Sequence, residues 1–484
     1  MLNFLSVSTI KQMLRIAGAK EMSNEIKETF ITNIETLDKK GSGRGVVWRD
    51  NGGENPKKLK LTVPETLVGE EVQVTVPNPD RKRAKVLPDE ILKASPDRTV
   101  PPCPHFEMCG GCVWQHWNYQ SQLNYKTSEV KRFLNEKGFD ENIVQDTMGM
   151  DDPFYFRNKM EFTFSKDGKL GLHELGNFRN IIDLDTCLIA SDDMVRAMKV
   201  VSEWTADHGL IGYDKDNHTG LLRHLMVRQS QVTKELMIAV FATEGPAGGL
   251  TEAVQDLVTR LVSGFENLES LMWMENRDMA DMAQSEETHI LHGRDYIHEE
   301  MSGYQYRVWF NTFFQTNPSQ AEKLVELAVD MAEVNEDETM IDLFCGVGTF
   351  SLPFAERVKS LAGIEIVESS IESAKRNAED NDIDNTYFLA KDARRGMDEI
   401  LETWGIPNLL MLDPPRSGAG GKVMRRIGRL GTNRVVYVSC NPESFADDIT
   451  WLREYGYELA RVQPVDLFPH SVHVEVVALL NKVN

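Results

Sequence analysis

Long apolar runs, cysteines and internal repeats are all scarce in this sequence of 484 residues. No apolar run reaches the roughly eighteen residues that span a bilayer, so we expect no membrane segment. Six unevenly spaced cysteines are too few for the disulfide scaffold of a secreted protein, and we expect a cytoplasmic protein. With 41% hydrophobic and 26% charged residues, the composition is that of a globular protein, and the length predicts about two to four domains.

Positive charge is also in short supply. The formal net charge of −22 excludes nucleic-acid binding over the whole surface, because phosphate contacts need local positive potential. Two stretches are exceptions: residues 414–434 hold six basic residues and no acid, and residues 81–85 hold four basic residues. Charge runs are usually solvated faces, but the first one directly follows an Asp-Pro-Pro-Arg motif, which favours a phosphate-binding role.

Short β-like patterns follow an N-terminal extension over residues 1–24. The extension is basic and has no acid before Glu21, which indicates a transit peptide or, as we favour, a start site placed too early, with Met22 as the true start. Residues 25–97 alternate β-like runs with Gly, Pro and Asn turns, which is typical of a small all-β barrel. A proline-rich linker then leads into a mixed α+β region over residues 98–310.

Helical patterns and apolar strand patterns alternate over residues 311–484. Apolar strands that are each followed by a helix are what a parallel sheet buried on both faces requires. The predicted fold class is therefore α/β, with a C-terminal doubly wound, Rossmann-like domain after an N-terminal β-barrel and a central α+β domain.

A glycine turn lies between the first strand and the first helix of this C-terminal pattern. In DLFCGVGTF, Gly346 and Gly348 let the backbone approach a ligand closely. Glu365 ends the next strand, where an acid binds ribose hydroxyls, and Asp392 ends the third strand in the same way. Ser351 stands where a dinucleotide fingerprint has its third glycine, so S-adenosylmethionine is the better fit; a domain without a nucleotide is the alternative.

Three further residues suggest covalent chemistry at later strand ends. The fourth strand ends in Asp-Pro-Pro-Arg, which begins with Asp413, and Cys440 lies at the C-terminal end of the fifth, where a thiolate nucleophile can reach a ligand. Glu475 lies among apolar residues in HVEVVALL, and burial would raise its pKa into a range useful for proton abstraction. For Asp413 the alternative is a proline turn that caps a strand. For Cys440 it is a packed core cysteine, and for Glu475 it is a surface glutamate.

Four of the remaining cysteines have the pattern of a metal site. Cys103, Cys109 and Cys112 lie close together in CPHFEMCGGC, and Cys187 lies further along the chain. Zinc ribbons usually pair two C-x-x-C motifs, which this sequence lacks, so an iron–sulfur cluster is preferred and zinc remains the alternative.

Together these motifs resemble the S-adenosylmethionine-dependent RNA uracil-5 methyltransferases, in particular the 23S rRNA branch (RumA or RlmD type). The resemblance extends over nearly the whole chain after Met22. It implies that residues 25–97 form a TRAM domain, an OB-like RNA-binding barrel, that residues 98–310 form an iron–sulfur domain, and that residues 311–484 form the methyltransferase domain. It also implies that residues 113–147 pack on the methyltransferase domain.

Residue roles also follow from the resemblance. Cys440 becomes the nucleophile and Glu475 the general base. The implied ligands of a [4Fe–4S] cluster are Cys103, Cys109, Cys112 and Cys187. The implied cofactor contacts are Gln315, Phe344, Thr349, Glu365, Asp392 and Asp413. Thr349 departs from several members of the family, which have asparagine there.

The expected reaction is methylation of carbon 5 of a uridine in RNA, with 23S rRNA as the first choice of substrate and tRNA as the second. We expect a monomer with RNA as its partner. A radical-type methylthiotransferase also combines a TRAM domain with a cluster, but its cysteine spacing and domain order differ. A catalytically dead RNA-binding protein would require the loss of Cys440, Glu475 or Asp413, and all three are present.

Overall fold

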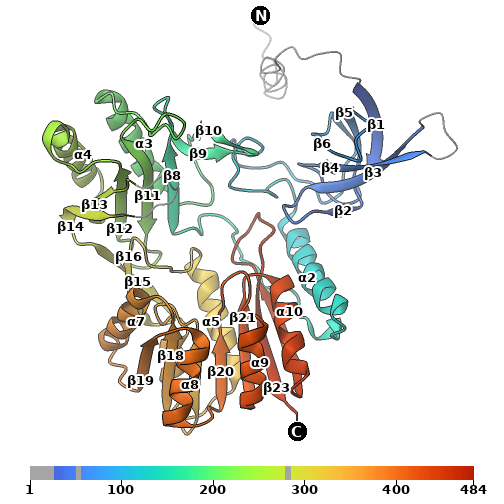
Figure 1. Ribbon diagram of the computed structural model, residues 1–484. Coiled ribbons are helices and arrows are strands. Elements are labelled where there is room, and N and C mark those ends of the chain that lie inside the picture. Colours follow the sequence, from blue (N-terminus) through green and yellow to red (C-terminus); the bar gives the residue numbers. More distant parts are fainter. Residues whose placement is uncertain (1–26, 51–55, 278–284, 484) are drawn as a thin grey trace, which may run out of the picture. The chain divides into compact units, whose positions relative to one another are not determined.

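The computed structural model describes residues 27–50, 56–277 and 285–483, and the expectations for residues 1–24 lie outside these ranges. The chain divides into two compact units, one that ends at Arg98 and one that begins at Thr99 (Figure 1). Among the described residues, every helix is too short or too polar to cross a bilayer.

The first unit consists of two small sheets over one core. One sheet has the order β1-β5-β7 and the other β2-β3-β4-β6. Side chains of β5 alternate between buried and half-buried positions, and Val72, Val74 and Val76 enter the core. The strands are β1 (Lys27–Asn33), β2 (Thr36–Leu37), β3 (Gly43–Arg49), β4 (Lys57–Val63), β5 (Glu71–Pro77), β6 (Arg83–Lys85) and β7 (Glu90–Lys93).

The second unit begins with the cysteine loop and continues into a seven-stranded sheet with the order β10-β9-β8-β11-β12-β13-β14. Its elements are α2 (Tyr119–Glu136), the 3-10 helix η1 (Glu141–Ile143), β8 (Lys159–Phe164), β9 (Leu170–Glu174), β10 (Asn177–Asp183), α3 (Asp192–Asp207), β11 (Leu222–Gln229), β12 (Leu236–Ala242), the 3-10 helix η2 (Gly248–Leu250), α4 (Thr251–Gly264), β13 (Leu268–Glu275) and β14 (Glu287–Gly293). A two-stranded sheet of β15 (Tyr296–Met301) and β16 (Tyr304–Trp309) follows.

This central sheet is covered on both faces. Every residue of β12 is buried, and alternate side chains of a strand point to opposite faces. Ile238 and Val240 join the apolar cluster that includes α3 and α4, whereas Met237 and Phe241 join a cluster that includes α5 of the C-terminal region. The central sheet and the C-terminal region therefore share a continuous apolar core.

A second seven-stranded sheet, which we call the C-terminal sheet, has the order β19-β18-β17-β20-β21-β23-β22. Its first five strands are parallel, and β23 pairs antiparallel with both β21 and β22. Its elements are α5 (Pro318–Ala332), β17 (Thr339–Leu343), α6 (Ser351–Ala355), β18 (Ser360–Glu365), α7 (Glu368–Asp380), β19 (Thr386–Ala390), α8 (Ala393–Trp404), β20 (Leu409–Leu412), α9 (Gly421–Leu430), β21 (Arg434–Ser439), α10 (Pro442–Arg453), β22 (Tyr457–Val465) and β23 (Glu475–Lys482).

Helices cover both faces of the C-terminal sheet, which confirms the predicted doubly wound α/β fold (Figure 1). One apolar cluster contains side chains of α5, α6 and α7, and another contains those of α8, α9 and α10. Val130 and Leu134 of α2 belong to the second cluster, and α2 contacts α10 and β22. The segment that follows the cysteine loop is thus part of the packing around the C-terminal sheet.

Candidate active site

Sheet pairing brings Cys440 and Glu475 to one edge of the C-terminal sheet. Cys440 directly follows β21, at the edge where the carboxyl ends of the parallel strands meet. Because β23 runs antiparallel to β21 and pairs Ser439 with Val476, Glu475 at the start of β23 lies opposite Cys440. Asp413 follows the neighbouring strand β20 at the same edge.

These side chains alter one another's protonation. Glu475 is buried, and burial, with a further contribution from Asp413, raises its pKa to about 8, against an opposing effect of Arg416. Burial raises the pKa of Asp413 to about 7. Burial, followed by the charges of Glu475 and Asp413, raises the pKa of Cys440 to about 11, and Arg416 again opposes the shift. A thiol, a buried acid and one cation therefore share this edge, and the surface-glutamate alternative for Glu475 is wrong.

Arg416 also contacts a residue that the sequence analysis missed. Its Nη2 lies 3.2 Å from Nδ1 of His473. Burial, with Arg416 and Lys126 as smaller causes, lowers the pKa of His473 to about 4, so the imidazole is neutral at pH 7. The only signal for His473 in the sequence is its place two residues before Glu475 in the same apolar run.

The turn after Cys440 is fixed to the loop that follows Asp413. Asn441 caps α10 through its side-chain oxygen, which accepts from the backbone N–H of Glu443 at 3.2 Å. Its Nδ2 donates to the carbonyl of Arg416 at 3.0 Å, and the Ser444 hydroxyl donates to the same carbonyl at 3.2 Å. The two loops that carry Cys440 and Arg416 are therefore held in one arrangement.

The predicted phosphate-binding run over residues 414–434 is divided by the fold. Arg434 begins β21, so the whole strand separates it from Cys440, and it pairs with Glu338. Arg426 pairs with Asp398 at 2.5 Å. Among the basic residues of this run, Arg416 is the one whose charge acts on the Cys440 and Glu475 pair.

The glycine turn lies at the end of β17, which is separated from β21 by β20 in the same sheet. Phe344 has a φ of +66°, and its N–H donates to the carbonyl of Ile364 at 2.8 Å, which ties the turn to β18. Asp342 is fully buried beneath the turn and accepts from the Ser351 hydroxyl at 2.6 Å through Oδ2. Its Oδ1 has no hydrogen-bond partner among the described residues, and burial raises its pKa to about 7. The turn is therefore fixed to β18, and the strand that leads into it carries one buried carboxyl oxygen that lacks a partner among the described residues.

The other predicted cofactor contacts come from different elements. Glu365 ends β18, and its Oε1 accepts from the N–H groups of Ile366 and Val367 at 2.7 and 3.0 Å. Asp392 is the N-cap of α8 rather than the end of a strand. Thr349 precedes α6, and Gln315 lies in the segment between β16 and α5. The charges of Glu365 and Asp413 both contribute to the raised pKa of Asp342, so these three acids lie near one another.

The cysteines of the predicted metal site come together away from this edge. Cys103, Cys109, Cys112 and Cys187 line one cavity. The cysteine loop is fixed to β9, because the N–H of Gly110 donates to the carbonyl of His173 at 3.1 Å and Cys109 forms a bridge with Glu174.

Four thiols around one cavity are a donor set for a soft metal centre. Burial raises the pKa of Cys109 to about 11 and that of Cys112 to about 12, and Cys103 and Cys187 add to both shifts. Metal ligation requires thiolates, and a cation in the cavity would lower these pKa values. The residues present therefore fit either an iron–sulfur cluster or zinc.

One group outside the predicted site also has ligand-like spacing. Ligand atoms of Glu275, Glu287 and His289 lie within 4.8 Å of one another. However, Glu275 is already bonded to Nε2 of His289 at 2.7 Å and to Arg277. The three side chains are therefore already engaged with one another and with Arg277.

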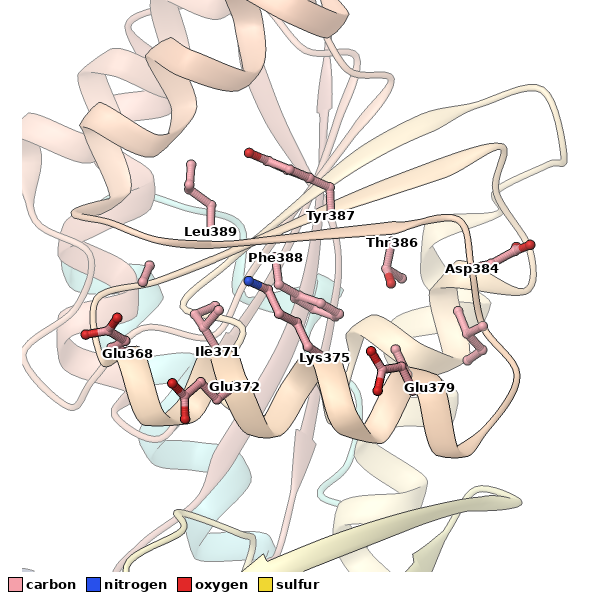
Figure 2. A pocket seen from close by; sticks show the side chains of 13 residues that line it. Glu368, Ile371, Glu372, Lys375, Glu379, Asp384, Thr386, Tyr387, Phe388 and Leu389 are labelled. Atoms are coloured by element: carbon pink, nitrogen blue, oxygen red, sulfur yellow. The ribbon is translucent and has the colours of Figure 1, made fainter.

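A groove of about 620 Å³ lies between α7 and β19 (Figure 2). Glu368, Glu372 and Glu379 of α7 line it together with Lys375. None of the predicted catalytic, cofactor or cysteine residues lines this groove.

Comparison with known proteins shows similarity along nearly the whole chain. A family model described as tRNA (uracil-5-)-methyltransferase matches residues 255–483. An uncharacterized RNA methyltransferase of Caldanaerobacter subterraneus subsp. tengcongensis is 34% identical over 461 residues, which are 94% of this chain and 99% of the relative. An uncharacterized RNA methyltransferase of Halalkalibacterium halodurans is 34% identical over 428 residues, which are 88% and 92% of the two chains.

A solved structure is similar over a comparable range. It is the crystal structure of a Pyrococcus abyssi tRNA (uracil-54, C5)-methyltransferase in complex with S-adenosyl-L-homocysteine. The two proteins are 27% identical with a TM-score of 0.71, and the match covers 93% of this chain and 99% of the other.

Proposed function

Because the chain belongs to the family of RNA uracil-5 methyltransferases, we propose that it methylates carbon 5 of one uridine in 23S rRNA, with S-adenosylmethionine as the methyl donor. The observation that carries the proposal is the pairing of β21 with β23, which sets Glu475 opposite Cys440. A nucleophile and a base on the same side of one ligand site are what this reaction needs.

The chemistry of uracil explains why both residues are required. Carbon 5 is too weak a nucleophile to accept a methyl group directly, so the thiolate of Cys440 first adds to carbon 6 and converts the ring to an enolate. When bound, S-adenosylmethionine supplies the methyl group and a positive sulfonium that favours the thiolate. Glu475 then takes the proton from carbon 5, the bond between carbon 6 and sulfur breaks, and the double bond re-forms.

Positive charge near Cys440 decides how much thiolate is available. With a pKa of about 11, the Cys440 thiol is mostly protonated at neutral pH. Arg416 already opposes this rise of the pKa, so its positive charge increases the fraction of thiolate. Arg416 is therefore proposed to stabilise the thiolate, and the neutral His473 beside it leaves that charge undiminished.

The proposed cofactor contacts surround the glycine turn, and Glu365 would bind the ribose hydroxyls from the end of β18. The full proposed set is Gln315, Phe344, Thr349, Glu365, Asp392 and Asp413. The single unsatisfied oxygen of buried Asp342 under the turn supports a polar ligand in this place.

The first unit is proposed to be a TRAM domain that grips RNA. Lys57, Lys58 and Lys60 of β4 and the basic residues 81–83 line one groove of about 560 Å³. Trp48 is 61% exposed, and Nζ of Lys58 lies 5.5 Å from its ring centroid. Phosphates need local positive charge and unpaired bases stack on aromatic rings, so this surface has both features of a single-stranded RNA site.

The cysteine cavity is proposed to hold a [4Fe–4S] cluster on Cys103, Cys109, Cys112 and Cys187, with zinc as the alternative. All six cysteines are free thiols, which supports our further proposal of a cytoplasmic protein. We also propose that the protein acts as a monomer.

A second candidate substrate is tRNA. The Pyrococcus abyssi neighbour is a tRNA enzyme and matches this chain along almost its full length, so architecture does not separate the two substrates. The choice of 23S rRNA depends on the resemblance of the motifs to the 23S rRNA branch.

The test incubates the protein and methyl-labelled cofactor with unmodified 23S rRNA and, separately, with unmodified tRNA. Nuclease digestion then identifies the labelled nucleoside and its position. We expect 5-methyluridine at a single position of 23S rRNA. Label in tRNA alone would replace the first candidate by the second, and label on any base other than uracil would overturn the proposal.

A further inference from the structure

Residues 466–474 form the loop between β22 and β23, and Glu475 is the first residue of β23. The loop also carries His473, which contacts Arg416. His470 within it has a φ of +62°, a left-handed conformation that a non-glycine residue keeps only where its surroundings impose it. The position of Glu475 therefore depends on what holds this loop.

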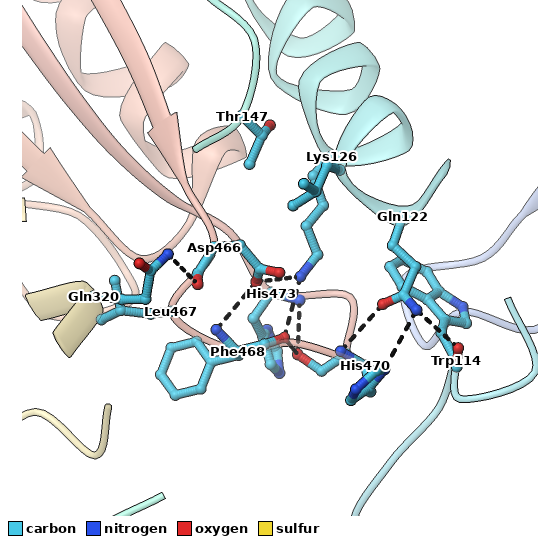
Figure 3. A network of polar contacts seen from close by, with 12 residues as sticks. Trp114, Gln122, Lys126, Thr147, Gln320, Asp466, Leu467, Phe468, His470 and His473 are labelled. Atoms are coloured by element: carbon cyan, nitrogen blue, oxygen red, sulfur yellow. Dashed lines mark hydrogen bonds and ion pairs between the residues drawn. The ribbon is translucent and has the colours of Figure 1, made fainter. Parts of the chain in front are cut away.

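A buried ion pair fixes the start of the loop to α2 (Figure 3). Nζ of Lys126 lies 2.6 Å from Oδ1 of Asp466, and the two side chains are 1% and 0% exposed. The Tyr119 hydroxyl donates to Oδ2 of the same carboxylate at 2.9 Å. Both carboxylate oxygens of Asp466 are thus bonded to side chains of one helix. We call the three residues Tyr119, Lys126 and Asp466 the Asp466 clamp.

The same lysine reaches further along the loop. Nζ of Lys126 donates to the carbonyl of Phe468 at 3.1 Å. The ring of Phe468 packs edge-on against His473 with the centroids 6.0 Å apart. The contacts therefore run without a break from Lys126 through Phe468 to His473, two residues before Glu475.

The middle of the loop is bonded to residues on either side of the start of α2. Oε1 of Gln122 accepts from the N–H of His470 at 3.1 Å. The carbonyl of His470 accepts from the N–H groups of Val113 and Trp114 at 2.8 and 3.1 Å. The ring of Phe154 stacks on the His470 imidazole at 4.7 Å. These contacts account for the left-handed backbone at His470.

A buried ion pair is weak evidence of added stability, because desolvation offsets the attraction of the two charges, and its better supported role is to select one arrangement. The arrangement selected here is that of the segment that leads into Glu475. We propose that Lys126, Tyr119 and Asp466 are positioning residues that hold the 466–474 loop so that Glu475 faces Cys440. They thereby set the rate of proton abstraction and product release, an inference that rests on the proposed methyl transfer.

The test separates formation of the covalent adduct from its release. Adduct formation is timed with RNA that carries 5-fluorouridine at the target, where the fluorine blocks release, and turnover is measured with ordinary RNA. In Lys126→Met we expect adduct formation within about threefold of the unsubstituted protein, while kcat falls at least about tenfold, because a displaced base loses part of its roughly 10²- to 10⁴-fold contribution. An SDS-resistant adduct should then accumulate on ordinary RNA.

Two further variants make the result decisive. Arg132→Met, on the same helix, removes two partly exposed ion pairs, with Glu129 and Glu136, and should leave both rates unchanged. Tyr119→Phe removes one hydrogen bond to Asp466 and should lower kcat severalfold without slowing adduct formation. If Lys126→Met does not fold, the result for Tyr119→Phe tests the proposal in its place. Unchanged turnover in the clamp variants, or an equal loss of both steps, would overturn the proposal. Failure of the unsubstituted protein to form the 5-fluorouridine adduct would instead refute the proposed function.

Discussion

Three acidic side chains near the strand ends that carry the glycine turn and Cys440 are buried, which makes their negatively charged forms unfavourable. Burial raises the pKa of Asp342 and Asp413 to about 7 and that of Glu475 to about 8. Such shifts are typical of catalytic acids and bases. A base with a pKa near the working pH can both take a proton from the substrate and return it to solvent, which suits Glu475 for the release step.

Replacing Glu475 separates this release step from methyl transfer. Glu475→Gln keeps the size of the side chain but cannot accept a proton, so kcat should fall by about 10²- to 10⁴-fold. Because Cys440 is intact, an RNA adduct should accumulate, and denaturing gel electrophoresis would detect it. The matched control is Glu458→Gln, at an exposed position of β22, which should turn over normally. A Glu475→Gln variant with normal kcat would show that another group is the base.

The raised pKa of Glu475 also makes folding depend on pH. The folded protein keeps this proton between the ordinary pKa of 4.5 and about 8, whereas the unfolded chain releases it. This contribution to stability is therefore complete below about pH 4.5 and is lost as the pH rises toward 8. In the cofactor-free protein the free energy of unfolding should fall by about 1.4 kcal/mol per pH unit from this group alone.

Denaturant titrations between pH 5 and pH 8 would measure that dependence. Glu475→Gln should reduce the slope, and Glu458→Gln should leave it unchanged. An identical slope in all three proteins would mean that Glu475 is not protonated in the folded state at neutral pH.

Among the structural elements, β9 supports the cysteine loop. A Cβ added to Gly171 would lie 1.9 Å from the carbonyl oxygen of Ile182, which is backbone of the paired strand β10. Gly171→Ala should therefore separate β9 from β10 and disturb the loop that is bonded to β9 through Gly110. Metal per protein and visible absorption should both fall.

Metal analysis and absorption spectra of the purified variant would check this. Gly264→Ala is the control, since an added Cβ there meets no atom within 4 Å. Normal metal content in Gly171→Ala would mean that β9 does not shape the cavity.

The sequence predicted the local structure of the elements better than their long-range pairing. Alternating apolar strands and helices predicted the α/β fold of the C-terminal region, because that pattern is local. The approach of Glu475 to Cys440 was not predictable from spacing, since it depends on the antiparallel register of β23 against β21. The Lys126 and Asp466 pair is separated by 340 residues, and His473 carried no distinctive signal of its own.

At the scale of the whole molecule, charge is distributed unevenly. The chain carries a net charge of −22, yet the first unit gathers lysines of β4 and residues 81–83 around one groove. A negatively charged protein can bind RNA only through such local concentrations of positive charge. The first unit would thus supply RNA affinity, while the second supplies the reaction.

Replacing Arg81, Lys82 and Arg83 together with Ala tests this division. We expect the KM for RNA to rise and the slope of log affinity against log salt to become shallower by about 2 to 3, because each lost phosphate contact removes roughly 0.7 to 0.9 from it. The KM for the cofactor should not change. Filter-binding at several salt concentrations would measure the slope, and an unchanged slope would place the RNA contacts elsewhere.

Attack of Cys440 on the uracil ring can be tested directly in a single trapping experiment. The protein is incubated with cofactor and RNA that carries 5-fluorouridine at the target position, and the digested adduct is analysed by mass spectrometry. We predict one methylated nucleotide attached to Cys440, no adduct in Cys440→Ala, and an adduct in Cys345→Ala, because Cys345 is buried in the glycine turn. An adduct at another residue, or one that persists in Cys440→Ala, would contradict it.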